Sequence, residues 1–221
     1  MSAVLLKALY LLHRLLVKAS AGHCRIVPYA LYAQPVGKAA AVPMRADAAT
    51  RVVRAKPGDA IVAHFPRPSA VIDRRFRAGY ECHVAEVNGE FAGYIWVSRV
   101  PYEEDEVSCL FDFARPDRSA WDFDVFVVPR WRLGRTMARL WRAVDMDLAA
   151  HGVRWSFSRI SLFNMGSLAS HARLSAVRIG WSVFLVAGRW QLGMFSTAPY
   201  LTLSHLGNRR PVLRLNEPSA A

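Results

Sequence analysis

The feature that most constrains the fold is the passage from an apolar strand into the longest amphipathic helix pattern of the chain. Residues 121–128, WDFDVFVV, are typical of a buried strand. After the stretch PRWRLGRT the apolar side chains continue at spacings of three and four, up to a stop at Gly152; they are Leu133, Met137, Leu140, Trp141, Val144 and Leu148. The sequence therefore predicts a strand, a tight turn around Gly134 and a long helix in direct succession.

Further strands precede and follow this passage. The dipeptide Asn88-Gly89 lies between apolar runs at 80–87 and 91–100, which is the strongest short-range signal for a β-hairpin. Other strands are predicted at 106–113, 153–160, 180–187 and 190–197, and short helices at 69–79 and 164–176. This order predicts an α+β fold with a single mixed, mostly antiparallel sheet and flanking helices.

The chain is predicted to divide into three segments. Residues 1–60 would hold an N-terminal amphipathic helix, a first strand and a connecting segment, in which 37–59 is expected to form a long connection or a short helix. Residues 61–205 would form the main domain, and residues 206–221 a C-terminal tail.

The N-terminal helix carries charges that argue against a membrane span. Lys7, Arg14 and Lys18 interrupt its apolar run before it reaches the ~18 residues that a span requires. The three cations fall on one side of a helical wheel. Two interpretations stay open: the helix packs on its own domain, or it lies on an anionic membrane surface.

Composition narrows the class of partner. The formal net charge of +12 favours an anionic partner: nucleic acid, phospholipid, a phosphorylated cofactor or an acidic protein. Nucleic acid is the weakest of these because the basic residues lack interleaved aromatic side chains. Cys24, Cys82 and Cys109 show neither disulfide nor zinc-ligand spacing, so we expect a cytoplasmic protein, with peripheral membrane contact as a variant.

The turn after the strand has the chemistry of a phosphate site. The first turn of a helix presents unpaired backbone N–H groups and the positive end of the helix dipole. Arg130, Arg132 and Arg135 surround Gly134 at that point and could add charge-assisted hydrogen bonds to an anion. The alternative is an ordinary turn, with Arg135, Arg139 and Arg142 forming a solvated stripe on the helix.

The two stretches VVPRWRLGRTMARLW and NMGSLASHARLSAVRIGW resemble the Gcn5-related N-acetyltransferase (GNAT) superfamily. That family has a strand ending in V-x-P, an Arg/Gly-rich pyrophosphate loop and a helix, followed by an Asn seven residues before a Tyr. The resemblance covers roughly residues 80–196. It implies the acyl-CoA N-acyltransferase (GNAT) fold and an acetyl-CoA or other acyl-CoA co-substrate, with no metal.

Carried over residue by residue, the resemblance implies a set of cofactor-binding residues: Val127, Val128, Arg130, Arg132, Leu133, Gly134, Arg135, Thr136, Met137 and Asn164. The chain departs from the family pattern in the spacing between Arg132 and Gly134, in Thr136 for a small residue, and in Ser175 for a glycine. His171 stands where the family has its Tyr.

Acyl transfer to an amine requires a base for the amine and an acid for the departing thiolate. His171 is the candidate acid, with a helix-packing role as the alternative. Asp122 and Asp124 would share one face of the predicted strand and are candidate bases, unless one of them pairs with an arginine such as Arg159. Glu104, in the acidic stretch 102–107, is a further candidate, although such a stretch is more often a solvated loop.

The sequence thus predicts an N-acyltransferase, of the acyltransferase class, that moves an acyl group, expected to be acetyl, from acyl-CoA to a primary amine by direct transfer. The acceptor would be a small molecule or a peptide. Two alternatives stay open: a long-chain N-acyltransferase whose donor is an acidic acyl carrier protein, and a catalytically silent protein of the same fold that binds a membrane or a protein partner.

Overall fold

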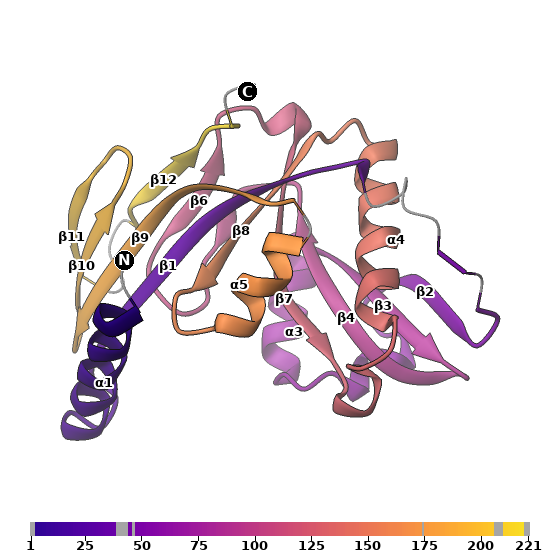
Figure 1. Cartoon of the computed structure of the whole chain (residues 1–221), viewed down its shortest axis with the longest axis horizontal. Helices are drawn as coiled ribbons and strands as arrows, with labels where there is room; N and C mark the ends of the chain where they lie inside the picture. The colour runs from indigo at the N-terminus through magenta and orange to yellow at the C-terminus, as the bar shows by residue number, and fades with distance from the viewer. Residues whose placement is uncertain (1–2, 39–43, 46, 174, 206–209, 219–221) are drawn as a thin grey trace. The chain divides into compact units, whose positions relative to one another are not determined.

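The computed structural model describes residues 3–38, 44–45, 47–173, 175–205 and 210–218 (Figure 1). The chain forms two compact units, each assembled from separate stretches of sequence. Unit 1 consists of Met1–Gln34, Pro101–Arg115 and Ser158–Ala221, and unit 2 of Pro35–Val100 and Pro116–Phe157. The units are described in turn.

Unit 2 contains the predicted strand–turn–helix passage. Its strands have the order β2-β3-β4-β7-β8, with antiparallel neighbours except for the parallel pair β7 and β8. The strands are β2 (Thr50–Ala55), β3 (Glu81–Val87), β4 (Glu90–Ser98), β7 (Ser119–Val127) and the first three residues of β8 (Trp155–Ser161). The helices are η1 (Ala60–His64), α3 (Ser69–Arg77), η2 (Pro116–Arg118), η3 (Pro129–Trp131) and α4 (Thr136–Ala150).

Local sequence explains the main features of unit 2. The β3–β4 hairpin turns at Asn88 and Gly89, which both have positive φ (53° and 78°), as a tight two-residue turn requires. Helix α4 buries Leu140, Val144 and Leu148 along one side, which confirms the predicted apolar stripe. Leu133 was expected to belong to this stripe, but the helix begins only at Thr136 and Leu133 is fully exposed in the turn.

Strand β7 is interrupted in its middle. Its register with β4 shifts between Tyr94 and Trp96, and Asp124 takes a left-handed backbone conformation with a φ of 44°. A non-glycine residue in this region is strained and needs support from its surroundings. The simple alternation of side chains on which we expected Asp122 and Asp124 to share a face is therefore broken at Asp124.

Unit 1 is built around the N-terminal strand. The order of its larger set of strands is β11-β10-β9-β1-β8, so β1 lies between β8 and β9. These strands are β1 (Cys24–Pro35), β9 (Val177–Ala187), β10 (Trp190–Phe195), β11 (Leu201–His205) and the last four residues of β8. A small second sheet has the order β12-β6-β5, formed by β12 (Val212–Leu215), β6 (Leu110–Phe113) and β5 (Tyr102–Glu103). The helices are α1 (Ala3–Ala19) and α5 (Met165–Arg173).

The predicted fold class is confirmed: the protein is α+β, with mixed, mostly antiparallel strands and few helices. Three local predictions need correction. The stretch 37–59 contains strand β2 within its described part, the predicted strand at 106–113 is limited to Leu110–Phe113, and β12 lies in the predicted tail. The unit boundaries also differ from the three predicted segments, because strands of residues 1–60 join both units.

The break in β7 leads to a stability prediction. A Cβ atom on Gly93 would lie 2.4 Å from the backbone carbonyl oxygen of Phe126, closer than any real contact. We expect Gly93→Ala to lower the free energy of unfolding by roughly 1–3 kcal/mol, measured by urea denaturation. In the control Gly166→Ala the new Cβ would be 3.7 Å from its nearest neighbour, so stability should stay or rise slightly. Equal stability of both variants would contradict the close approach.

Candidate functional site

The turn between β7 and α4 is the candidate cofactor site, and it lies wholly in unit 2. After β7 ends at Val127 the backbone forms a short 3-10 turn, with hydrogen bonds from Trp131 N to Val128 O (2.8 Å) and from Gly134 N to Trp131 O (3.2 Å). Helix α4 then begins at Thr136. The N–H groups of its first turn have no partner inside the helix, so they and the helix dipole favour an anion at this end.

The arginines of the turn are not equivalent. Arg130 forms an ion pair with Glu90, and its guanidinium lies 5.3 Å from the centre of the Trp131 ring. Arg132 donates from Nε to the carbonyl oxygen of Val127 at 2.9 Å. Among the residues that the structure describes, no ion pair or hydrogen bond involves the Arg135 side chain. Arg135 is therefore the arginine of the turn that is available to a ligand.

The expected stripe of solvated arginines on α4 is only partly present. Arg139 forms an ion pair with Asp47 at 2.9 Å, and its side chain is mostly buried. It also donates to Thr50 Oγ1 at 3.3 Å, which ties α4 to the start of β2. Arg139 therefore has a structural role, whereas Arg135, one turn earlier, is available to a ligand.

Gly134 keeps the turn open. Its φ lies outside the left-handed region, and a Cβ atom there would be 3.4 Å from the Trp131 carbonyl oxygen, which is ordinary contact. The backbone of unit 2 therefore does not require glycine at this position. Glycine has a clear advantage only if a ligand approaches the backbone closely.

Asp124, a candidate base, is held by three donors. It accepts hydrogen bonds from Arg67 Nε (2.9 Å), Arg75 Nη1 (2.5 Å) and the Tyr94 hydroxyl (3.1 Å). Arg75 is buried, with its guanidinium 5.1 Å from the centre of the Phe123 ring. Burial would raise the pKa of Asp124, but the hydrogen bonds and positive charges of the two arginines outweigh it and lower the pKa. Asp124 is thus a weak base that supports the strained backbone of β7.

Asp122 has a different environment in the same unit. It is buried and accepts a hydrogen bond of 2.6 Å from the Ser156 hydroxyl, which joins β7 to β8. Asp122 therefore links the two strands at a buried position, and it stays, like Asp124, a candidate base from the sequence.

Glu104 lies in unit 1 and is fully buried in an ion-pair network. Arg159 donates to both of its carboxylate oxygens, from Nε at 2.9 Å and from Nη2 at 2.5 Å. The Arg159 guanidinium also lies 4.5 Å from the centre of the Tyr29 ring, and the Tyr29 hydroxyl donates to Glu106 Oε2 at 2.6 Å. Burial and the negative charge of Glu104 raise the pKa of Tyr29. The acidic stretch therefore contains a buried network and is not simply a solvated loop.

Helix α5 carries the other predicted residues of unit 1. Asn164 precedes the helix and accepts a hydrogen bond from Ser167 N at 3.0 Å, which confirms it as the predicted cap. His171 is 7% exposed, so its imidazole does not face solvent. Its Nδ1 lies 2.9 Å from the Ser167 carbonyl oxygen, and this contact is a hydrogen bond when Nδ1 carries the proton. Nε2 is then the atom that can exchange a proton with a ligand.

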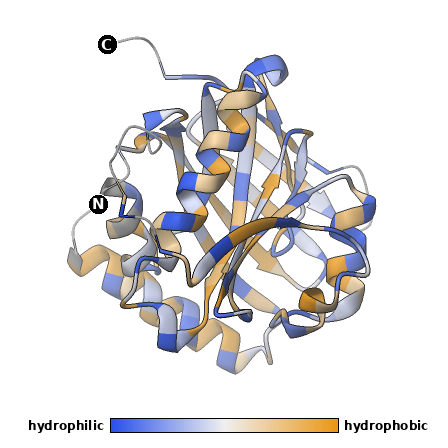
Figure 2. Ribbon diagram, turned by 90° about the vertical axis from the view of Figure 1, so that its right-hand side faces the viewer, coloured by the Kyte–Doolittle hydropathy of each residue, from blue (hydrophilic) through white to orange (hydrophobic). Residues whose placement is uncertain are grey.

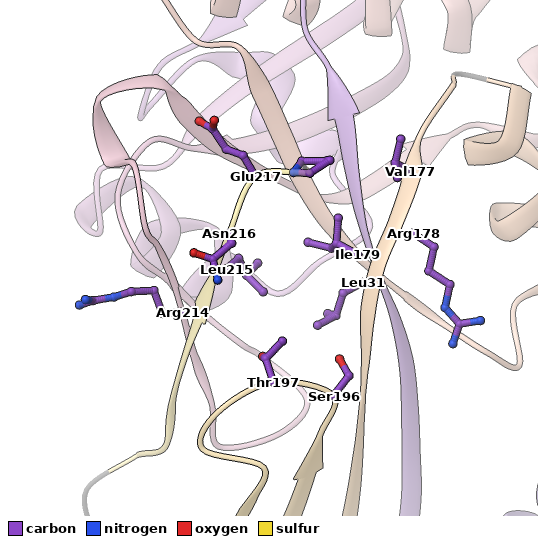
Figure 3. A pocket seen from close by; sticks show the side chains of 11 residues that line it. Leu31, Val177, Arg178, Ile179, Ser196, Thr197, Arg214, Leu215, Asn216 and Glu217 are labelled. Atoms are coloured by element: carbon purple, nitrogen blue, oxygen red, sulfur yellow. The ribbon is translucent and has the colours of Figure 1, made fainter. Parts of the chain in front are cut away.

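A separate pocket of about 370 Å³ lies within unit 1 (Figure 3). Leu31, Ile179 and Leu215 form its apolar wall, and Ser196 and Thr197 point toward it. Thr197 Oγ1 is buried and has no hydrogen-bond partner in the described part of the chain. The predicted site residues do not line this pocket, and the Arg178 and Arg214 side chains in Figure 3 point away from its centre. Its lining is mixed, with apolar and polar side chains in similar proportion.

Sequence reasoning missed the partners that fix these carboxylates. Arg67, Arg75 and Tyr94 meet Asp124 from the loop ahead of α3, from α3 and from β4, and Arg159 meets Glu104 across 55 positions of sequence. No periodicity or short motif links such residues. Within the described ranges, no group of three or more His, Cys, Asp and Glu side chains is arranged to hold a metal ion.

Comparison with known proteins gives structural matches only. No protein-family model matches the chain, and no curated protein matches its sequence. A functionally unknown conserved protein from Staphylococcus epidermidis matches with a TM-score of 0.55 and 13% identity over 79% of this chain and 67% of its own. A tandem GNAT protein from the clavulanic acid biosynthesis pathway matches with a TM-score of 0.53 and 18% identity over 77% of this chain.

These matches establish the fold. The chain has the fold of the GNAT superfamily, as the resemblance of its two motifs predicted. It spans 56% of the length of the tandem GNAT protein. At 18% identity the likeness concerns the fold, so the activity must be argued from the residues themselves.

The Asp124 cluster allows a stability test. Asp124→Asn leaves the buried Arg75 without its counter-charge, so we expect a loss of roughly 3–5 kcal/mol in the free energy of unfolding at pH 7. The folded-state pKa of Asp124 is lowered, so the stabilisation is complete above the unfolded-state pKa of about 4 and is lost as the pH falls through the folded-state value. The difference in the free energy of unfolding between the parent and Asp124→Asn should therefore become smaller in acid. Urea denaturation at pH 7 and at an acidic pH measures this difference.

Asp112→Asn is the matched control, because Asp112 pairs with the largely exposed Arg214 at 3.2 Å. It should cost less than about 1 kcal/mol. A loss equal to that of Asp124→Asn, or a gap between Asp124→Asn and the parent that does not change with pH, would contradict the proposed charge support.

Proposed function

We propose that the protein is an N-acyltransferase that moves an acyl group from an acyl-CoA thioester to a primary amine by direct transfer. The observation that carries this proposal is the β7–α4 turn, where an open glycine, a helix N-terminus and the available Arg135 side chain meet in unit 2. The GNAT fold of the structural matches supports acyl transfer over other reactions of phosphate-bearing substrates.

In this proposal the diphosphate of coenzyme A lies on the turn. The backbone N–H groups of Leu133 and of residues 135–137 and the Arg135 guanidinium would bind its oxygens, while the backbone of Val127 and Val128 would contact the pantetheine arm. Arg130 and Arg132 act indirectly, since Glu90 and the Val127 carbonyl hold them. Leu133, Thr136 and Met137 contribute through their backbone positions. Asn164 contributes by capping α5.

The chemistry requires two proton transfers. The amine must lose a proton before or during attack on the thioester carbonyl, and the thiolate that leaves must gain one. We assign the second role to His171: as the imidazolium, with its Nδ1–H on the Ser167 carbonyl oxygen, it would give the Nε2 proton to the thiolate and become neutral. For the first, Asp122, Asp124 and Glu104 are the candidate carboxylates; arginine donors hold the last two. Water could connect Asp122 with the amine.

The acceptor is proposed as a small molecule or a peptide that bears a primary amine. Acetyl is the proposed acyl group. The net charge of +12 would also suit an acidic acyl carrier protein that delivers a longer chain, and this stays the second candidate donor. A protein that binds coenzyme A without turnover would correspond to the catalytically silent alternative.

The turn can be tested by calorimetry with coenzyme A. Gly134→Val should abolish measurable binding, because its methyl groups would occupy the space of the diphosphate while the fold stays intact. Arg135→Gln should weaken binding by roughly tenfold or more, through loss of a charge-assisted contact. Leu133→Ala, which truncates an exposed side chain of the same turn, is the control and should bind like the parent. Equal affinity of all four proteins would rule out the turn as the diphosphate site.

His171 can be tested by kinetics once a turnover assay with an amine is available. His171→Ala should lower kcat by roughly two to four orders of magnitude with little change in donor affinity, which is the signature of a transition-state contact. His171→Phe should behave like Ala, and His171→Tyr should restore part of the rate. Melting temperatures of the variants distinguish a loss of catalysis from misfolding caused by a change at a buried residue. Parent-like turnover in all three variants would leave His171 as a packing residue of α5.

A further inference from the structure

The outer face of β9, β10 and β11 in unit 1 is mostly apolar, with His205 beside Trp190 at its edge. Side chains alternate along each strand, and those pointing away from the buried side are Trp181, Val183, Leu185, Trp190, Leu192, Met194, Leu201 and Leu203. Strand register aligns them in rows, such as Leu185, Leu192 and Leu203. We call these eight residues the outer face.

The outer face is not covered in the part of the chain that the structure describes. Five of its residues are exposed, including Trp190 (55%) and Leu203 (69%), and the other three are half-buried. Soluble proteins rarely expose a contiguous apolar surface of this kind without a binding role. The buried side of the same strands is mixed, with Phe184, Val186 and Phe195 beside polar groups such as Ser182 and Gln191. The strands therefore have apolar side chains on both sides and lack the polar outer side that is usual for an antiparallel sheet.

Helix α1 adds a second exposed apolar surface in the same unit. Val4, Leu11, Leu12 and Leu15 project from one side of the helix and are all exposed. The other side packs on unit 1, where Tyr10 contacts the Phe163 ring at 5.2 Å. The α1 ribbon in Figure 2, which begins near the N label, is mostly orange with short blue segments.

Helix α1 and the outer face are neighbours. The Ile26 backbone N–H donates to His13 Nδ1 on α1 at 3.3 Å. Ile26 on β1 is the register partner of Leu185 on β9, which belongs to the outer face. Figure 1 shows α1 beside the lower ends of β9 and β10. The helix and the sheet face therefore form one surface of unit 1.

The charged side chains on this surface are all positive. Lys7, Arg14 and Lys18 lie along one flank of the exposed apolar side of α1. Residues 1–46 and 148–216, which include α1, β9, β10 and β11, contain no Asp or Glu. A partner that complements this surface must be apolar and carry negative charge at the edge of its apolar part.

We propose that α1 and the outer face dock on an anionic phospholipid bilayer. A bilayer offers acyl chains to the leucines and negative headgroups to the three lysine and arginine residues. Trp181 and Trp190 are suited to the boundary between headgroups and acyl chains. A second copy of the chain fits less well, because its matching surface would bring only like charges. Within the described residues no helix is long and apolar enough to cross a membrane, so the contact is peripheral.

This inference does not depend on acyl transfer. It concerns a surface made of α1, β9, β10 and β11, whereas the proposed cofactor turn is in unit 2. If both proposals hold, the enzyme works at a membrane surface. Either one can fail without the other.

The experiment uses the full chain and vesicles in a sedimentation assay. We expect binding to vesicles of phosphatidylcholine and phosphatidylglycerol in equal amounts, weaker binding to phosphatidylcholine alone, and partial release in high salt. The double variant Leu11→Gln/Leu15→Gln and the single variant Leu203→Gln should each weaken binding by at least roughly tenfold. The triple variant Lys7→Gln/Arg14→Gln/Lys18→Gln should lose roughly fivefold per cation on anionic vesicles.

Two controls carry the same chemical changes elsewhere. Met146→Gln replaces an exposed apolar residue of α4, and Lys56→Gln removes an exposed cation of unit 2; both should bind vesicles like the parent. Circular dichroism should show that all variants fold, since each changed residue is exposed or half-buried. Three outcomes overturn the proposal: no binding to anionic vesicles, parent-like binding by all surface variants, or a dimer in light scattering that the leucine variants dissociate.

Discussion

Asp124 joins three elements of unit 2 at the point where strand β7 is interrupted. It accepts hydrogen bonds from Arg67 ahead of α3, from Arg75 within α3 and from Tyr94 on β4. These donors support the strained backbone at Asp124, and the strain accompanies the shift in register between β4 and β7. The remainder of β7 then leads directly into the turn around Gly134. The geometry of the candidate cofactor site therefore depends on a charge cluster that is not itself part of it.

The β7–α4 turn combines three features that favour binding of an anion. A helix N-terminus supplies backbone donors, Gly134 leaves room for a ligand, and Arg135 supplies one available positive charge. The neighbouring Arg130 and Arg132 are held by Glu90 and by the Val127 carbonyl, which fixes the shape of the turn. Carboxylates also hold the structure together: arginine donors hold Asp124 and Glu104, and Asp122 joins β7 to β8 through the Ser156 hydroxyl. The ion pairs named here hold strands, helices and loops in position.

Unit 1 combines a buried polar network with an apolar exterior. Glu104 pairs with Arg159 in its interior, where an unpaired charge would be costly, and the Arg159 guanidinium lies over the Tyr29 ring. At the same time the outer face and α1 present leucine and tryptophan side chains to the surroundings. Strand β1 lies between β8 and β9 in the sheet. It is also tied to α1, because the Ile26 backbone N–H donates to His13 Nδ1. This placement makes the N-terminal segment an integral part of the unit.

The sequence by itself determined the features that depend on neighbours along the chain. The Asn88-Gly89 hairpin, the apolar stripe of α4 and the Asn164 cap were predicted because turn chemistry, helical periodicity and capping are local. The GNAT fold was predicted from the resemblance of two motifs to that family. Tertiary structure alone decided the break at Asp124, the pairing of Glu104 with Arg159, the burial of His171 and the insertion of β1. Each of these brings together groups that are far apart in sequence, so no local pattern encodes them. Whether an arginine is free or paired, as with Arg135 and Arg139, is likewise settled by which acceptor the fold places beside it.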